Sequence, residues 1–456
     1  MPFVAVDPST GNEIRRYESI SPAAAAEAAS RSGEVQAQWS RTPFATRAGV
    51  LRRAAEILED DADRWSRLMA REMGKPLAQG RSEAAKCASV LRYYADHGAD
   101  LLADRRVQVE GGRAGWVYRP LGVLLAIRPW NFPLWQVFRM AAPTLMAGNG
   151  VLLKHAESVP GCAGATEEIF LRAGLPEGLF RNLFLEVEDV EGLLDHPAIQ
   201  GVSLTGSVAA GRAVAAQAGA RLKRCVLELG GSDPYVVLAD ADPDQALDRI
   251  VTSRLLNAGQ SCISAKRVIV GSEHYEGLRE GILERFRLLR VGDPTDEGVE
   301  MGPMAREDLR DTLHDQVVRS VDAGAVLELG GRVPRNDGAW YPPTVLSGVT
   351  PDNPAFREEL FGPVAVLIQA RNDAHALALA NDTAFGLGAA VFTRDEARGE
   401  EIARDELHAG ACFVNDFVRS DPRLPFGGIK QSGYGRELSP LGIREFVNAK
   451  TVWVAE

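Results

Sequence analysis

The sequence lacks the features of a disulfide-stapled, metal-binding or membrane-spanning protein. Only five of its 456 residues are cysteines, they lie far apart with no C-x-x-C pair, and the seven histidines are scattered. This pattern gives neither a disulfide framework nor a zinc site. Apolar runs such as residues 121–127 are far shorter than the roughly 20 residues of a membrane helix, and residues 1–18 lack the apolar core of a signal peptide. We therefore expect a cytoplasmic protein with no metal and no membrane partner.

Positive charge is scarce as well. The formal net charge is -11 at pH 7, which argues against a nucleic-acid partner because phosphate recognition needs clustered lysine and arginine. Apolar residues make up 45% of the 456 positions, so the chain can bury a large core. A chain of this length predicts a globular protein of two or three domains.

The hydrophobic pattern predicts two α/β units. Residues 22–104 show helical periodicity, and residues 107–120 have the turns and short branched runs of a β-ribbon. Continuous apolar strands alternate with helices from residue 123 to 229 and again from 230 to 416. This alternation is typical of parallel sheets covered on both faces, which bind ligands at the carboxyl ends of their strands. We expect two closely packed, doubly wound domains with a cleft between them.

Cys262 lies in the stretch LLNAGQSCISAKR, between a predicted turn and two cations. The thiolate is the nucleophilic form of cysteine, and nearby cations and partial exposure favour it. Gly259 allows a tight turn, while Lys266 and Arg267 supply positive potential. The local sequence leaves two readings open, a nucleophile or a small apolar residue buried in the core.

Two polar residues follow predicted strands. Glu228 ends the apolar run of CVLELGGSDP, where it can act as a general base or simply face solvent. Asn131 stands between a strand and a helix in IRPWNFPLWQVFR. Its amide can stabilise an oxyanion, or it can cap the helix. Position alone decides neither case.

The usual dinucleotide fingerprint G-x-G-x-x-G is absent after the early strands. In its place SLTGSVAAG runs from a strand through Gly206 into a helix, with Gly211 five residues later. A helix N-terminus behind a glycine can bind a pyrophosphate. Lys154 and Glu157, in LLKHAE, end another strand, where they can contact ribose hydroxyls or remain ordinary surface charges.

Seven segments in order, spread over almost the whole chain, resemble the aldehyde dehydrogenase superfamily. They are PWNFP (129–133), LLKHAE (152–157), LTGS (204–207), LELGGSDP (227–234), GQSC (259–262), EELFGPV (358–364) and PFGGIKQSGYGRE (425–437). The chain is most similar to the short bacterial succinate-semialdehyde dehydrogenases, through WNFPLWQVFR, KCVLELGGSDP, GPMAR and SDPRLPFGG.

The resemblance implies an aldehyde dehydrogenase-like α/β fold with two doubly wound domains, one of them Rossmann-like, and a small β oligomerisation element. The implied segments are an NAD(P)-binding domain (1–106 and 121–229), a catalytic domain (230–433) and oligomerisation segments (107–120 and 434–456). A homodimer or a homotetramer is expected, because exposed edge strands need cover that a second subunit can supply.

The family mechanism, carried over residue by residue, assigns roles to three residues. Cys262 attacks the aldehyde carbon and forms a thiohemiacetal, Asn131 and the Cys262 N–H hold the oxyanion, and Glu228 activates water to hydrolyse the thioester. The resemblance thereby favours the nucleophile over the buried apolar reading. With all three residues present a non-catalytic relative is not expected, and Glu228 favours hydrolysis over acyl transfer to CoA.

The resemblance also implies which residues contact the cofactor. They are Trp130, Lys154, Glu157, Gly206, Ser207, Gly211, Leu229, Glu359 and Phe361. A carboxylate can accept a hydrogen bond from a ribose 2′-OH but repels a 2′-phosphate. Glu157 therefore predicts NAD as the preferred cofactor, with NADP as the alternative.

Substrate choice depends on Arg139, which follows Asn131 by eight residues, roughly two helical turns. In the subfamily the matching arginine, with a residue matching Ser420, binds the distal carboxylate of the substrate. This predicts NAD(P)-dependent oxidation of succinate semialdehyde to succinate. Some relatives place a second arginine six residues before the nucleophile, where this chain has Leu256. A broader aldehyde dehydrogenase, acting on glutarate semialdehyde or uncharged aldehydes, is therefore the alternative.

Overall fold

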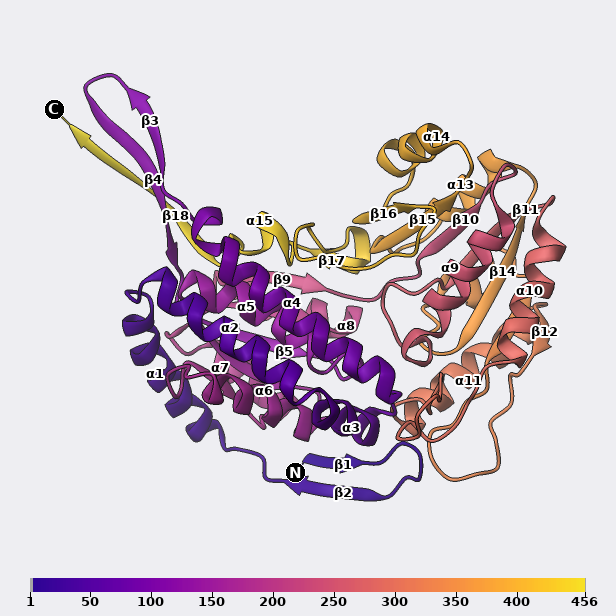
Figure 1. Cartoon of the computed structure of the whole chain (residues 1–456), viewed down its shortest axis with the longest axis horizontal. Coiled ribbons are helices and arrows are strands. Elements are labelled where there is room, and N and C mark those ends of the chain that lie inside the picture. The colour runs from indigo at the N-terminus through magenta and orange to yellow at the C-terminus, as the bar shows by residue number, and fades with distance from the viewer. Residues whose placement is uncertain (1–2, 456) are drawn as a thin grey trace.

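The computed structural model describes residues 3–455 and contains two α/β lobes and a projecting β-sheet (Figure 1). One lobe is built around a six-stranded sheet and the other around a seven-stranded sheet. The N-terminal hairpin of β1 (Phe3–Val6) and β2 (Glu13–Tyr17) lies beside the first lobe. The outermost residues of the expected segments, 1–2 and 456, lie outside the described part of the chain.

The six-stranded sheet has the doubly wound topology that the sequence predicts. Its members are β5 (Val123–Arg128), β6 (Gly150–His155), β7 (Phe180–Asn182), β8 (Ile199–Thr205), β9 (Arg224–Glu228) and β17 (Gly433–Tyr434). The order is β17-β9-β8-β5-β6-β7, parallel except at β17. The chain starts at β5, winds outward through β6 and β7, and returns on the other side through β8 and β9. The direction of winding changes between β5 and β8, which is where such sheets bind ligands.

Helices cover both faces of this sheet. They are α1 (Pro22–Trp39), α2 (Phe44–Asp60), α3 (Ala62–Met73), α4 (Leu77–Leu101), α5 (Trp135–Ala147), α6 (Pro160–Arg172), α7 (Val190–Leu194) and α8 (Val208–Ala220). Alternate strand residues point to opposite faces. Leu124 and Ala126 pack in the core formed with α2 to α6, while Val123 and Leu125 pack in the core formed with α1, α7 and α8.

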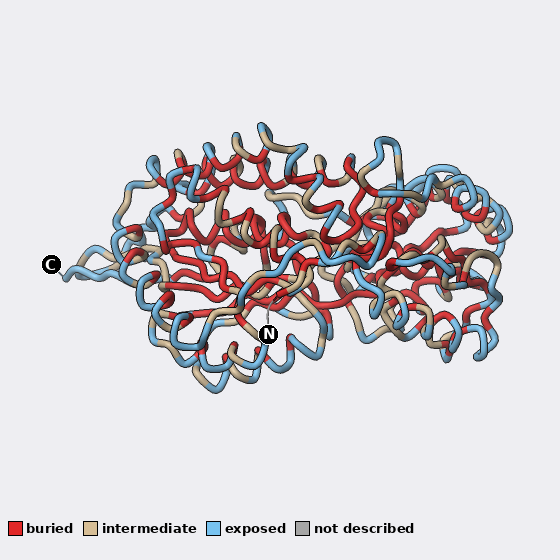
Figure 2. The backbone as a smooth tube through the Cα atoms, turned by 90° about the horizontal axis from the view of Figure 1, so that it is seen from below, coloured by how far each residue is buried: buried red, intermediate tan, exposed pale blue. Residues whose placement is uncertain are grey.

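The seven-stranded sheet forms the second lobe. Its strands are β10 (Pro234–Val237), β11 (Arg267–Gly271), β12 (Val326–Leu329), β13 (Thr344–Ser347), β14 (Val364–Ala370), β15 (Gly388–Phe392) and β16 (Ala411–Val414), in the order β12-β13-β14-β11-β10-β15-β16. Only β12 is antiparallel to its neighbour. Around it lie α9 (Pro243–Leu255), α10 (Tyr275–Arg287), α11 (Glu307–Asp322), α12 (Pro354–Arg357), α13 (Asp373–Asn381) and α14 (Glu396–Glu401). Figure 2 shows buried backbone running through both lobes.

The structure corrects one boundary in this lobe. The pattern ALDRIVTSRLLNAG predicts a helix that continues to Gly259, but α9 ends at Leu255. Asn257, Ala258 and Gly259 then have φ values of +57°, +52° and +71°. Left-handed residues cannot continue a right-handed helix, so the chain turns sharply just before Cys262.

The third sheet projects from the first lobe and carries the C-terminal strand. It consists of β3 (Arg105–Val109), β4 (Gly112–Pro120) and β18 (Val447–Ala455) in the order β18-β4-β3, and the short helix α15 (Ser439–Gly442) precedes β18. Val107, Trp453 and Val454 on this sheet are 47%, 54% and 47% exposed. The predicted ribbon is present, and these three apolar side chains are largely uncovered by the rest of residues 3–455.

Two searches of the described residues gave negative results. No helix between residues 3 and 455 has the length and apolar character needed to cross a membrane. Within the same range no group of three or more histidine, cysteine, aspartate or glutamate side chains could hold a metal ion.

Candidate active site

A cavity of about 320 Å³ lies between the two lobes. Its walls come from α4 and α5 of the first lobe and, from the second, from residues 261–264 and 417–420. Cys262, Arg139 and Ser420, all singled out in the sequence, line it. The structure therefore brings the predicted nucleophile and both predicted substrate contacts into one space of small-molecule size.

The left-handed turn before Cys262 is held by hydrogen bonds. Non-glycine residues pay roughly 1–2 kcal/mol each for a left-handed conformation, so Asn257 and Ala258 persist only because their surroundings fix them. The Asn257 side-chain amide donates to the carbonyls of Asn131 (2.7 Å) and Gln260 (3.1 Å). A Cβ at Gly259 would overlap the carbonyl oxygen of Gly362, so this turn requires glycine. The turn carries the thiol to Asn131.

Asn131 is tied to the same turn from the other side. Its Nδ2 donates to the Gln260 carbonyl at 3.1 Å, and its backbone oxygen accepts from Lys75 at 3.1 Å. The side chain is 4% exposed. An amide nitrogen carries two hydrogens, so one remains for a bound oxygen atom.

A buried ion pair, Lys75–Glu83, lies beneath this loop. Both side chains are almost fully buried. Glu83 also accepts from the backbone N–H groups of Leu134 and Trp135, both at 2.9 Å, at the start of α5. Because a carboxylate is favoured at a helix N-terminus, Glu83 fixes α5, while Lys75 fixes the Asn131 carbonyl. One ion pair thus sets the positions of two walls of the cavity.

The thiol of Cys262 is neutral in this structure. Burial raises its pKa to about 12, and the opposing charges of Lys266 and Arg139 reduce the rise only in part. Lys266 donates to the carbonyls of Ser261 (2.9 Å) and Cys262 (2.7 Å). The second predicted cation, Arg267, instead donates to backbone carbonyls elsewhere in its lobe, so its guanidinium is directed away from the catalytic loop.

Glu228 is buried at the end of β9, and neither of its carboxylate oxygens has a hydrogen-bond partner among the described residues. Burial, aided by the nearby charge of Glu437, raises its pKa well above the ordinary value. Burial would also raise the pKa of Glu437, but Arg139 and Arg128 outweigh it and hold that pKa below the ordinary value. The two carboxyl groups therefore differ, and Glu228 is the one that can carry a proton near neutral pH.

Three residues predicted to contact the cofactor lie around the same loop. Trp130 and Phe361 meet edge to face, with ring centroids 5.8 Å apart. Glu359 pairs with Lys266 at 3.0 Å and accepts from the Gly231 N–H at 3.0 Å. A Cβ at Gly230 would overlap a Glu359 oxygen, so glycine makes room for this carboxylate.

Other residues predicted to contact the cofactor lie at the ends of β6 and β8. Lys154 is 6% exposed and pairs with the exposed Glu157 at 3.3 Å. Gly206 and Ser207 join β8 to α8, and the Ser207 hydroxyl accepts from the third residue of the helix at 3.2 Å.

Gly211 and Leu229 are in contact across α8 and β9. A Cβ at Gly211 would lie 2.6 Å from the Leu229 side chain, so glycine permits this packing. The ends of strands β6 and β8 thus carry a cation, a carboxylate and the N-terminus of α8. These polar groups fit a dinucleotide.

His155 has a structural position. Its ring Nε2 donates to the Pro133 carbonyl at 2.9 Å, and its Nδ1 accepts from the Ala156 N–H at 2.8 Å. Burial lowers its pKa to about 4, so the ring is neutral. It joins the end of β6 to the loop that carries Asn131.

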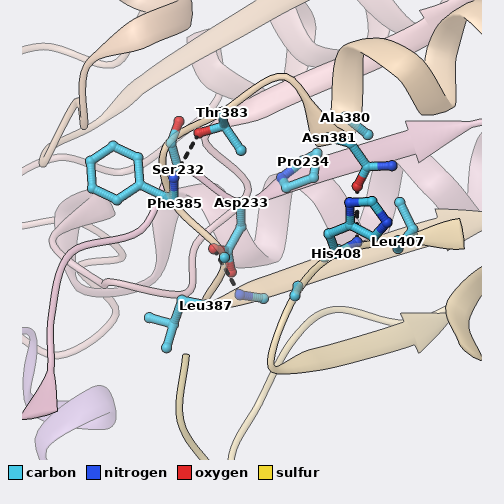
Figure 3. A pocket seen from close by; sticks show the side chains of 14 residues that line it. Ser232, Asp233, Pro234, Ala380, Asn381, Thr383, Phe385, Leu387, Leu407 and His408 are labelled. Carbon is cyan, nitrogen blue, oxygen red and sulfur yellow. Dashed lines mark hydrogen bonds between the residues drawn. The ribbon is translucent and has the colours of Figure 1, made fainter. Parts of the chain in front are cut away.

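A second, much smaller crevice lies in the second lobe (Figure 3). Its volume of about 10 Å³ leaves room for no more than one water molecule. Asp233 accepts from the Gly388 N–H there at 3.1 Å, and burial raises its pKa to about 7. None of the predicted site residues lines this crevice, so it belongs to the packing of β10 and β15.

Sequence reasoning missed three side chains that the structure places at the site. Glu437 lies in the quoted motif PFGGIKQSGYGRE but was not singled out, and Lys266 was noted only as a nearby charge. Lys86, which lines the cavity, lies within α4. A lysine among buried alanine, cysteine and valine positions was the available signal.

Comparison with known proteins identifies the class. The model described as the aldehyde dehydrogenase family matches residues 2–452. The chain belongs to the aldehyde dehydrogenase family, which confirms the resemblance and the predicted fold.

Several similar proteins are named succinate-semialdehyde dehydrogenase. A probable succinate-semialdehyde dehydrogenase (NADP(+)) of Synechocystis is 46% identical over the full length of both chains. Succinate semialdehyde dehydrogenase (NAD(P)+) Sad of Escherichia coli K12 is 46% identical over 99% of this chain and 97% of that protein. The crystal structure of succinic semialdehyde dehydrogenase from Streptococcus pyogenes with NADP+ has a TM-score of 0.97 at 34% identity, covering both chains completely.

The Lys75–Glu83 pair gives a test of what holds the site together. Glu83→Gln leaves a buried lysine without its counter-charge, which costs about 3–5 kcal/mol of unfolding free energy. The matched control is Glu59→Gln, which breaks an exposed pair with Arg92 and costs less than about 1 kcal/mol. Urea unfolding followed by tryptophan fluorescence measures both. Equal losses in the two variants would contradict the role given to the buried pair.

Proposed function

We propose that this chain oxidises succinate semialdehyde to succinate with a nicotinamide dinucleotide as the oxidant. The observation that carries the proposal is the cavity in which Cys262 shares a wall with the cations Arg139 and Lys86. An aldehyde with a distal carboxylate suits such a space, because charge-assisted hydrogen bonds are strong and directional. The similar proteins from Synechocystis and Escherichia coli are named for the same substrate, which supports the proposal.

The first step is attack of the Cys262 sulfur on the aldehyde carbon. A thiol with a pKa of about 12 gives up its proton only as the C–S bond forms, and that proton leaves to solvent water. The aldehyde oxygen becomes negative and is held by the free amide hydrogen of Asn131 and the Cys262 N–H. Hydrogen bonds of this kind are strongest where water is excluded.

The thiohemiacetal carbon must then lose a hydride to become a thioester on Cys262. A nicotinamide dinucleotide would accept this hydride, and Glu359 and Phe361 would hold it at one end and Lys154 and Glu157 at the other. Ionised Glu228 next takes a proton from water, the resulting hydroxide attacks the thioester carbon, and the sulfur leaves. The products are the carboxylate and a thiolate that takes up a proton.

Three readouts test this function. We expect kcat/KM for succinate semialdehyde to exceed that for butanal by at least about 10-fold, the value of one charge-assisted contact.

Glu228→Gln should release about one equivalent of reduced dinucleotide per subunit and then stall, because hydrolysis requires the base, and Cys262→Ala should release none. Wild-type deacylation should rise with pH through the raised pKa of Glu228, since only the ionised form accepts a proton.

Other outcomes would replace the proposal. Equal kcat/KM for succinate semialdehyde and butanal would point to the broader aldehyde dehydrogenase. Acyl-CoA formation when CoA is added would point to a CoA-acylating enzyme instead of a hydrolytic one.

We also propose NAD as the preferred cofactor. Glu157 borders a surface cleft of about 460 Å³ that Glu186, Glu188 and Arg306 also line. Arg306 is itself paired with Asp308. A carboxylate at position 157 repels a 2′-phosphate and can accept a hydrogen bond from a 2′-hydroxyl. Several relatives are named as NADP(+) enzymes. The proposed preference for NAD therefore depends on the residues of this chain and has to be tested on them.

The test of cofactor choice is Glu157→Ser. Removing the carboxylate should raise the ratio of kcat/KM with NADP to that with NAD by about 10-fold or more, as expected for removing one close like charge. Glu191→Ser, at an exposed carboxylate on α7 paired with Arg221, is the control. An unchanged ratio in Glu157→Ser would refute the assignment.

A homodimer or homotetramer is the proposed assembly, with the projecting sheet at the interface. Its exposed apolar residues support this, because a free β-edge with apolar side chains invites pairing. Trp453→Glu should shift the protein toward monomers by light scattering, while Leu222→Glu, at a residue 96% exposed on the first lobe, should not. A monomeric wild type would refute the interface.

A further inference from the structure

Lys86 is a cation in the cavity wall without a carboxylate partner. It lies in α4, is partly buried, and lines the same cavity as Cys262. Its Nζ donates to the Ser420 hydroxyl at 2.8 Å and stands 4.4 Å from the centre of the Trp135 ring. No ion pair joins it to any carboxylate of residues 3–455 within 4.0 Å.

This arrangement costs free energy unless a ligand completes it. Charged groups removed from water are normally paired, since an uncompensated buried charge is strongly unfavourable. An ammonium group has three donors, and Ser420 takes one. Burial, helped by the charge of Arg139, lowers the pKa of Lys86 to about 8, so the protein itself supplies too little negative potential. An anion in the cavity would supply it.

The other cations of the cavity each contact a carboxylate, although the buried Nη2 of Arg139 has no hydrogen-bond partner among residues 3–455. Arg139 donates from Nε to Glu437, which also binds Arg128. Arg419 pairs with Asp416. The position where some relatives carry another arginine is Leu256, an apolar residue of the cavity wall.

We propose that Lys86, assisted by Ser420, binds the distal carboxylate of the aldehyde substrate. The inference rests on the proposed function and deepens it by naming the residue that selects ω-carboxy aldehydes over uncharged ones. Arg139 lines the same cavity and keeps an unpartnered Nη2, so it is the second cation available to this carboxylate while its Nε holds Glu437. The sequence expectation that Arg139 binds the carboxylate largely alone is the competing assignment.

The first experiment compares succinate semialdehyde with butanal, an uncharged aldehyde of the same chain length. In Lys86→Met the ratio of kcat/KM for the two substrates should fall about 10- to 100-fold, because one charge-assisted contact is lost. Lys86→Arg should restore most of the ratio. Lys223→Met, at a partly buried lysine outside the cavity whose Nζ donates to the His196 carbonyl at 3.0 Å, should leave the ratio unchanged.

The outcomes separate the inference from the function on which it rests. If wild type shows no preference for succinate semialdehyde, the proposed function fails. If wild type shows the preference and Lys86→Met keeps it while Arg139→Lys loses it, the function stands and the assignment to Lys86 is overturned.

A second experiment does not depend on how the methionine variant folds. Succinate serves as a competitive inhibitor against the aldehyde, and its inhibition constant is measured from pH 7 to 9.5 with wild type and Lys86→Arg. Because the cation binds the anion and is lost as pH rises through about 8, the wild-type constant should rise about 10-fold or more, as the population of charged lysine falls. In Lys86→Arg it should stay flat.

The titratable groups that face Lys86 do not obscure the pH dependence measured in this experiment. Glu83 and Cys87 share its helix, Arg139 faces it from α5, and Cys262 faces it from the catalytic loop. Burial keeps both thiols neutral across this range, and Glu83 is paired with Lys75. A flat wild-type curve, or an equal rise in both proteins, would overturn the inference, since an equal rise would trace to a group such as Glu228.

Discussion

The buried pair of Lys75 and Glu83 is the contact on which the geometry of the site depends. Lys75 can be buried only with a counter-charge, and Glu83 supplies it while also accepting two N–H groups at the start of α5. Lys75 in turn holds the backbone of Asn131. One charge pair therefore fixes the oxyanion donor and the helix that carries Arg139. Either partner alone would be a buried unpaired charge, so the two walls stay in place together.

The charges around the cavity form an unequal set that determines what it can bind. Arg128 and Arg139 share the single carboxylate of Glu437, and burial raises the pKa of Glu228. Lys86 adds a cation that pairs with no carboxylate of residues 3–455. The local sum is positive although the whole chain is acidic, with a net charge of -11. A local excess of one sign inside a low-dielectric cavity favours an anionic substrate more than the same charges would in water.

Sequence analysis predicted the features that repeat along the chain or lie in contiguous motifs. Alternating strands and helices predicted the doubly wound sheets, and GQSC with LELGG singled out Cys262 and Glu228 as the proposed catalytic residues. A turn before Cys262 was predicted too, but the helical pattern through LLNAG did not reveal its left-handed residues, because side-chain periodicity does not report φ. Adjacent Lys266 and Arg267 were equivalent as sequence, yet only Lys266 faces the catalytic loop. Lys86 is far from Cys262 in the chain, and folding alone brings them to one cavity.

Burial has two opposite effects on the chemistry proposed for this site. It raises the pKa values of Cys262 and Glu228, so the thiol loses its proton less readily and is a poor target for adventitious electrophiles. The same exclusion of water strengthens the hydrogen bond that Asn131 offers to a developing oxyanion. In the proposed reaction a charged aldehyde would place its carbonyl beside the thiol, so that proton loss and C–S bond formation would proceed together. The surroundings that suppress the free thiolate would then also stabilise the adduct it forms.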